Sequence, residues 1–208
     1  MSEVTSGTPP GAIDLYWIPL GAGAHVVRLS GKAYEAIVAF TQRRAPSELY
    51  HTALEVAGPD ARFVIECAPI PDDEGRTRGV VAEGPVGMAP AGRFRVFRYE
   101  IRRWRGGSIS DADQAVGSPV RVTVDVDRAQ RLLDLVPSVP TLVWGRDELH
   151  AGDMWNSNSL TAWLLARSGI GVRGLQPPRG GRAPGWRAGL VAARSEMVPV
   201  GSGVPVTR

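Results

Sequence analysis

The chain lacks several features that would assign it to a class of protein. Its 208 residues include a single cysteine, Cys67, which excludes an internal disulfide framework and a zinc site built from cysteines. No stretch reaches the roughly twenty apolar residues that a membrane-spanning helix needs. Residues 1–10 contain no apolar segment of the kind found in a signal peptide, so we expect a cytoplasmic protein.

Charge of one sign is also scarce. The formal net charge is +3, which by itself is too small to indicate nucleic-acid binding. Hydrophobic residues make up 43% and charged residues 22% of the chain, proportions that are typical of a soluble globular protein. Its length predicts one domain over residues 13–200, preceded by a disordered tail (1–12) and followed by a C-terminal tail (201–208).

What the sequence does contain is a strongly apolar segment over residues 153–168. Its apolar side chains recur at helical spacing, namely Leu160, Trp163 and Leu164. The other side of this helix is apolar too, so we expect it to be buried. Small polar residues that suit an N-cap stand at its start: Asn156, Ser157 and Asn158. Its free N–H groups and positive dipole end would therefore face whatever lies there, and Gly169 suits the left-handed stop.

A β-hairpin is predicted earlier in the chain, with strands over residues 48–57 and 62–68 joined by a Gly-Pro turn. Alternation places the first strand's residues on two faces, with Leu49, His51, Ala53 and Glu55 opposite Tyr50, Leu54 and Val56. Such a hairpin would bring His51 close to Glu66, and a carboxylate can hold an imidazole and keep it basic. The alternative is a half-buried histidine and a solvated glutamate.

The remaining segments are predicted from periodicity and turn residues. We expect a helix over 31–43, strands over 93–105 and 120–126, and a short helix capped by Asp127. After Gly171 we expect loops with one short apolar run over 188–193. Arginines alternate with aromatic residues in 93–105, as in a strip that binds nucleic acid. The same alternation is typical of an antiparallel strand with one solvated face, which we favour because the rest of the chain is not basic.

The order of these features resembles the papain-like superfamily. The resemblance is to its circularly permuted NlpC-type branch. It lies in the order of three features: a strand with a histidine, a carboxylate on the next strand, and a small nucleophilic residue at the start of a buried helix. That branch includes lecithin:retinol acyltransferase-like, YiiX-like and PPPDE-like proteins. The resemblance is carried by residues 50–56, 63–67 and 155–160. It implies an α+β fold with a central helix packed on an antiparallel β-sheet.

The resemblance also implies roles for individual residues. In that branch the helix typically opens with a nucleophilic cysteine, and the matching position here is Ser157, with His51 as general base and Glu66 as orienting residue. The oxyanion and substrate would be held by Asn156, Asn158 and Trp155. Serine departs from the family pattern, because a thiol is partly ionised near neutral pH whereas a hydroxyl needs a base in the transition state.

Three functions follow. The first is a hydrolase or acyl transferase that acts on an amide or ester bond through a Ser157–His51–Glu66 triad. The alternative is a catalytically inactive papain-like binding module that lost the nucleophilic cysteine, and an arginine-rich nucleic-acid binder comes third. Cys67 as nucleophile is disfavoured, because a lone cysteine in an apolar strand is usually an inert core residue.

No cofactor and no metal are expected. The three histidines do not stand at a ligand spacing such as i, i+4 on one helix, namely His25, His51 and His150. Four tryptophans could line a substrate groove, although filling of the core is favoured: Trp144, Trp155, Trp163 and Trp186. A small-molecule or peptide substrate, no nucleic acid and no membrane span complete the expectations.

Overall fold

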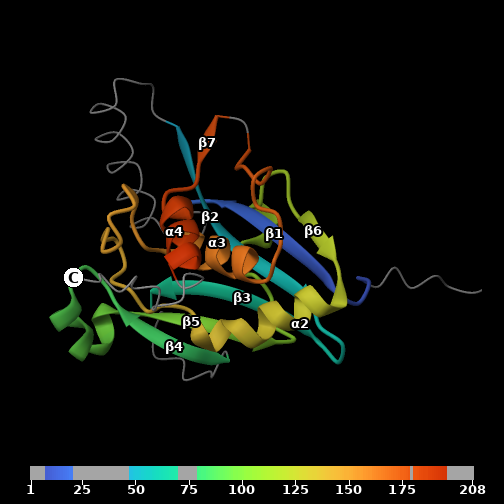
Figure 1. Cartoon of the computed structure of the whole chain (residues 1–208), viewed down its shortest axis with the longest axis horizontal. Coiled ribbons are helices and arrows are strands. Elements are labelled where there is room, and N and C mark those ends of the chain that lie inside the picture. Colours follow the sequence, from blue (N-terminus) through green and yellow to red (C-terminus); the bar gives the residue numbers. More distant parts are fainter. Residues whose placement is uncertain (1–7, 21–46, 70–78, 179, 196–208) are drawn as a thin grey trace, which may run out of the picture.

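The computed structural model describes residues 8–20, 47–69, 79–178 and 180–195, and within them three helices lie on a largely antiparallel sheet (Figure 1). This confirms the predicted α+β class with a helix packed on an antiparallel sheet. The strands are β1 (Ala12–Pro19), β2 (Glu48–Ala57), β3 (Arg62–Pro69), β4 (Val80–Pro85), β5 (Arg98–Arg105), β6 (Val120–Val124) and β7 (Gly181–Arg182). Their order is β4-β5-β3-β2-β1-β6, and β7 pairs in parallel with the start of β2.

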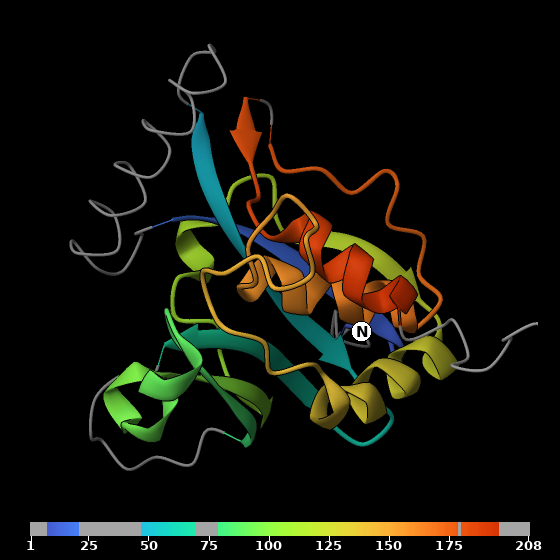
Figure 2. The ribbon, with the colours of Figure 1, turned by 60° about the vertical axis from the view of Figure 1, so that its left-hand side comes forward.

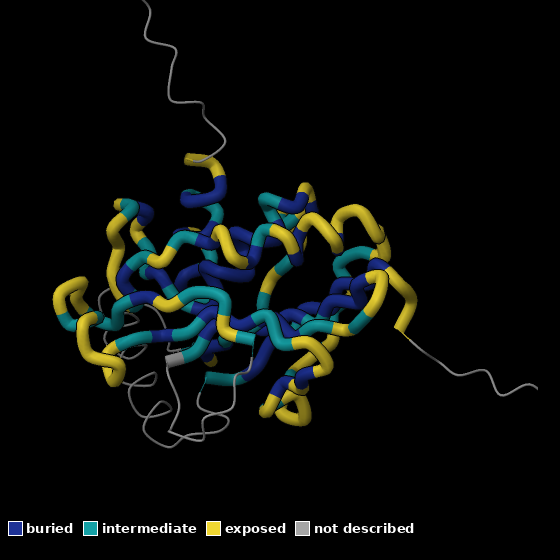
Figure 3. The backbone as a smooth tube through the Cα atoms, turned by 90° about the horizontal axis from the view of Figure 1, so that it is seen from below, coloured by how far each residue is buried: buried dark blue, intermediate teal, exposed yellow. Residues whose placement is uncertain are grey.

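The hairpin of β2 and β3 forms as the sequence predicts. Its register pairs Leu54 with Ile65 and Glu55 with Val64, so equivalent positions of the two strands share a face. One face carries the main core and packs against the helices, and we call it the helix face. The other carries the ion pairs that join neighbouring strands, and we call it the charged face. Figure 3 shows the buried segments running through the middle of the fold.

The helices are α2 (Val126–Leu135), α3 (Ser157–Arg167) and α4 (Trp186–Ser195). In Figures 1 and 2, α4 lies over α3, and α3 lies over the sheet. The predicted central helix is therefore confirmed as buried nearly all round, because it has the sheet on one side and α4 on the other. Gly189 permits this approach, since an added Cβ would lie 2.1 Å from the carbonyl oxygen of Ser159.

Two helix predictions need correction. The segment after Gly171 was expected to form loops, yet it contains α4, whose buried alanines pack on α3. Its glycines and arginines gave little helical signal, and tertiary packing outweighs that local propensity. Helix α2 begins two residues earlier than a cap at Asp127 allows, because its N-cap is Asp125, whose side chain accepts a hydrogen bond from the Arg128 N–H.

The arginine-rich segment is a strand only in its second half. Residues 89–97 form two short 3₁₀ helices, η1 (Ala89–Arg93) and η2 (Arg95–Phe97), before β5 begins at Arg98. A strand over these residues would have no core to pack against, since Phe94, Val96 and Phe97 are all exposed. Two further 3₁₀ helices are η3 (Ala112–Gln114) and η4 (Val136–Ser138).

Several expectations fall outside the described residues. These are the helix over 31–43, the histidine at position 25 and most of the two predicted tails. Within the described ranges, no helix combines the length and apolar character that crossing a membrane requires.

Candidate functional site

The start of α3 meets strand β2 through a threonine rather than a histidine. The hydroxyl of Thr52 hydrogen-bonds to Asn158 Oδ1 at 3.0 Å and to Thr161 Oγ1 at 2.9 Å. Neighbouring residues of a strand point to opposite faces, so the ring of His51 lies on the charged face. Ser157 is the first residue of α3 on the helix face, and the sheet therefore separates it from His51.

Glu66 shares the charged face with His51, but its carboxylate has another partner. Arg102 donates to Glu66 Oε1 at 2.9 Å and to Glu100 Oε2 at 2.7 Å. The charged group that acts on His51 is instead Asp111, in the loop after β5. Burial lowers the pKa of the His51 ring, and the nearby Asp111 carboxylate partly opposes that shift. Glu66 therefore does not orient His51 as a triad would require.

The structure does not assemble the predicted Ser157–His51–Glu66 triad. A general base must lie within hydrogen-bond reach of the proton that it takes, at about 2.6–3.2 Å or through one water. Alternation along β2 places His51 on the face opposite to Thr52, which contacts α3, and Glu66 is hydrogen-bonded to Arg102. Strand parity directs His51 away from the helix, so a triad of these three residues stays a prediction that these contacts do not support.

The residues expected to hold an oxyanion or a substrate have structural partners. Asn156 caps α3, accepting from the N–H groups of Asn158 and Ser159 through Oδ1, and donates through Nδ2 to the Pro184 carbonyl. Asn158 donates through Nδ2 to the carbonyls of Tyr50 and Pro184, at 2.9 and 2.8 Å. Both side chains are therefore used in fastening α3 to β2 and to the segment before α4.

Trp155 is also a structural residue. Its side chain is only 1% exposed and belongs to the main core, together with Trp163. A ligand at the surface would not reach it. The favoured interpretation of the tryptophans as core residues is correct for Trp155 and Trp163, whereas Trp186 is only partly buried.

A network of uncharged side chains thus occupies the place where the resemblance puts a catalytic pair. We call Thr52, Asn158 and Thr161 the α3 network. All three are buried, and none can act as a general base near neutral pH. The sequence held a signal for Thr52, because it shares its face with the apolar residues Tyr50 and Leu54, and an apolar face packs on the core.

Cys67 has no catalytic character. It lies in the main core on the helix face, and burial raises the pKa of its thiol well above the ordinary value, with a further contribution from the Glu66 carboxylate. The thiol is therefore protonated at neutral pH, and a protonated thiol is a poor nucleophile. The prediction that Cys67 is a core residue is confirmed.

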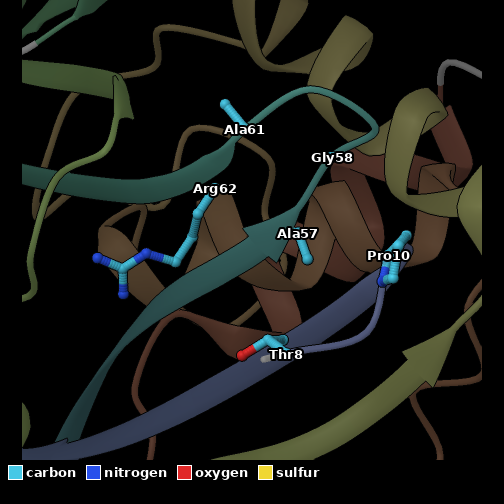
Figure 4. Close-up of a pocket in the computed structure, with 6 residues that line it drawn as sticks. All are labelled: Thr8, Pro10, Ala57, Gly58, Ala61 and Arg62. Carbon is cyan, nitrogen blue, oxygen red and sulfur yellow. The ribbon is translucent and has the colours of Figure 1, made fainter. Parts of the chain in front are cut away.

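A small pocket of about 270 Å³ lies beside the turn between β2 and β3 (Figure 4). It is lined by Thr8, Pro10, Ala57, Gly58, Ala61 and Arg62. Arg62 is its only charged residue, and its guanidinium already donates to Glu55 and to the Gly107 carbonyl. In Figure 4 this guanidinium points away from Pro10 and Ala57. The pocket therefore offers little polar chemistry to a ligand.

A larger pocket of about 520 Å³ lies between α4 and the segment that precedes it. We call it the arginine pocket. Its lining consists of Val172, Arg173, Leu175, Gln176, Pro177, Gly181, Arg182, Ala183, Trp186, Leu190 and Arg194. Every charged residue in that lining is an arginine. Sequence reasoning missed this site, because its residues lie in the segment that was expected to form loops.

Among the described residues, no group of three or more His, Cys, Asp or Glu side chains is placed to hold a metal ion. Comparison of the chain with protein-family models, with curated proteins and with solved structures finds no match. The resemblance to the papain-like superfamily therefore stays a prediction.

Proposed function

We propose that this chain is a binding domain without hydrolase activity, in which the contact between a buried helix and an antiparallel sheet is retained for stability. This is the second of the three functions that the sequence indicates. In this proposal the likeness to the papain-like superfamily concerns the architecture, and the catalytic roles given to Ser157, His51 and Glu66 are not carried over.

One observation carries the proposal. The side chain on β2 that contacts the start of α3 is the hydroxyl of Thr52, which hydrogen-bonds to Asn158 and Thr161. Activation of a serine requires a base within hydrogen-bond reach, and a threonine hydroxyl cannot serve as one near neutral pH. The buried α3 network also leaves no ionisable group at that contact, so acyl transfer through a serine–histidine pair is not supported.

The test is an assay of ester and amide hydrolysis on the full chain. We expect the wild-type protein to hydrolyse p-nitrophenyl esters and peptide amides no faster than the Ser157→Ala and His51→Ala variants do. Thermal melting monitored by circular dichroism would establish that each variant is folded. Turnover that disappears in both folded variants would refute the proposal.

A gain-of-function control sharpens this test. The single change Ser157→Cys would supply a thiol while His51 stays on the other side of the sheet, so the proposal expects it to create no activity. Adding Thr52→His in the same protein would place an imidazole on the helix face, toward α3. Activity from Ser157→Cys alone would show that His51 reaches the start of α3.

A further inference from the structure

The arginine pocket combines a positive rim with an apolar wall. Arg173 and Arg194 form no hydrogen bond or ion pair among the described residues, and both are exposed. Arginines on the sheet behave differently: Arg62, Arg102 and Arg121 each have a carboxylate partner. Since the lining contains no acidic residue, the positive charge at this pocket is not compensated from within it.

The apolar wall is built around Trp186, at the start of α4. Its ring contacts Trp17, with the ring centroids 5.3 Å apart, and that contact holds the indole in place. Leu190 follows one turn later on the same helix, and Val172 and Leu175 line the pocket from the preceding segment. An aromatic side chain with one side held by the core offers its remaining surface to a flat or aliphatic group.

We propose that the arginine pocket binds a small molecule that carries an oxyanion, a carboxylate or a phosphate, on an apolar body. Arg173 and Arg194 bind the oxyanion, for which the planar guanidinium supplies paired donors. Trp186 and Leu190 contact the apolar body. The volume of about 520 Å³ lies within the range of roughly 300–1,000 Å³ that small-molecule sites occupy. This inference rests on the proposed binding function, to which it adds a site and a ligand class.

The experiment uses naphthyl phosphate and naphthoate as probes, measured by isothermal titration calorimetry on the full chain at low salt. Both probes are expected to bind saturably at one site per chain. Naphthol lacks the oxyanion and inorganic phosphate lacks the apolar body, so each is expected to bind at least about tenfold more weakly. A preference between the two oxyanion probes identifies the oxyanion that the site selects.

Variants then locate the binding. Arg173→Glu combined with Arg194→Glu is expected to weaken binding of naphthyl phosphate by at least about tenfold, because both donors become acceptors. The matched control is Arg105→Glu combined with Arg131→Glu, which makes the same change of charge at two exposed arginines outside the pocket. It should change affinity by less than about threefold through long-range electrostatics. Arg173→Lys keeps the charge but loses the fork, and an intermediate effect is expected.

Three outcomes would overturn the inference: no saturable binding of either oxyanion probe, equal losses in the pocket and control variants, or binding of naphthol as tight as that of naphthyl phosphate. A melting temperature like that of wild type would establish that the double variants are folded. Failure here is distinct from failure of the proposed function, which fails on hydrolysis sensitive to Ser157→Ala and His51→Ala. If the pocket is empty and no hydrolysis occurs, the binding domain has its site elsewhere.

Discussion

The two faces of the sheet satisfy their polar groups in different ways. On the helix face, the α3 network consists of uncharged side chains that hydrogen-bond to one another and to backbone carbonyls. On the charged face, ion pairs join neighbouring strands, such as Arg102 with Glu66 and Arg121 with Asp14. Thr52 and His51 are adjacent in sequence, yet each belongs to a different one of these environments.

This difference shows what burial against a helix demands. A buried charge is costly unless it is paired and hydrogen-bonded, whereas a neutral amide or hydroxyl needs only a hydrogen-bond partner. The contact of α3 with β2 uses neutral groups, whereas the acid–base chemistry predicted from the sequence needs an ionisable group there. The charged face holds His51 and the paired carboxylates and arginines, but the nucleophile candidate Ser157 is on α3, at the helix face.

The largest effect is expected from removing the cation at the centre of the charged face. Arg102 is 3% exposed and contacts two carboxylates, so Arg102→Met leaves Glu66 and Glu100 close together without compensation. We expect a loss of about 3–5 kcal/mol in the free energy of unfolding at pH 7, measured by urea denaturation. Arg98→Met, which breaks the more exposed pair with Glu83, should cost under about 1 kcal/mol. Equal losses would mean that burial does not distinguish the two pairs.

A smaller effect is expected from the α3 network. Asn158→Leu leaves the carbonyl of Tyr50 and the hydroxyl of Thr52 without this partner inside the core. The free energy of unfolding should fall by about 2–3 kcal/mol. Because the groups involved are neutral, we expect the same loss in low and high salt. Ser157→Ala serves as control and should lower the free energy of unfolding by under about 1 kcal/mol. If it lowers that free energy as much as Asn158→Leu does, Ser157 belongs to the α3 network as well.

The smallest effect concerns His51 and the dependence of stability on pH. Burial lowers the pKa of the folded histidine below the unfolded value of about 6.5, so the unfolded chain binds its proton first as pH falls. The contribution of His51 is complete above about pH 6.5 and is lost as pH falls toward the lower folded pKa. His51→Gln should flatten the fall in unfolding free energy between pH 7 and pH 5, as measured by urea titrations. An unchanged slope would contradict a depressed pKa.

Local sequence signals were sufficient for the main elements. The hairpin of β2 and β3 follows from alternation and a Gly-Pro turn, and α3 follows from helical spacing and small polar caps. Helix α4 was missed because its stability comes from packing on α3. Gly189 allows the two helices to approach closely, whereas by its low helix propensity alone a glycine at this position argues against a helix. Interpretation of the arginine-rich segment as one long strand failed because no core lies beside Phe94 and Phe97.

The candidate site was harder to predict than the fold. Bringing together His51, Glu66 and Ser157 required knowing which face of β2 packs on the helix, and the sequence marked that face only through Tyr50, Leu54 and Val56. The arginine pocket depends on segments whose relative positions are set by contacts distant in sequence, such as that of Trp17 with Trp186. Spacing along the chain contains no direct information about such contacts.

The sequence by itself determined the class of fold, the hairpin and the capped, buried helix, because each depends on periodicity and caps within a short segment. Only the tertiary structure decided that Thr52 rather than His51 contacts α3 and that Arg102 hydrogen-bonds to Glu66. It also decided that Arg173 and Arg194 line the same pocket. The physical reason is that a strand presents its residues alternately to two faces. Which face becomes the core is settled by packing of the whole chain.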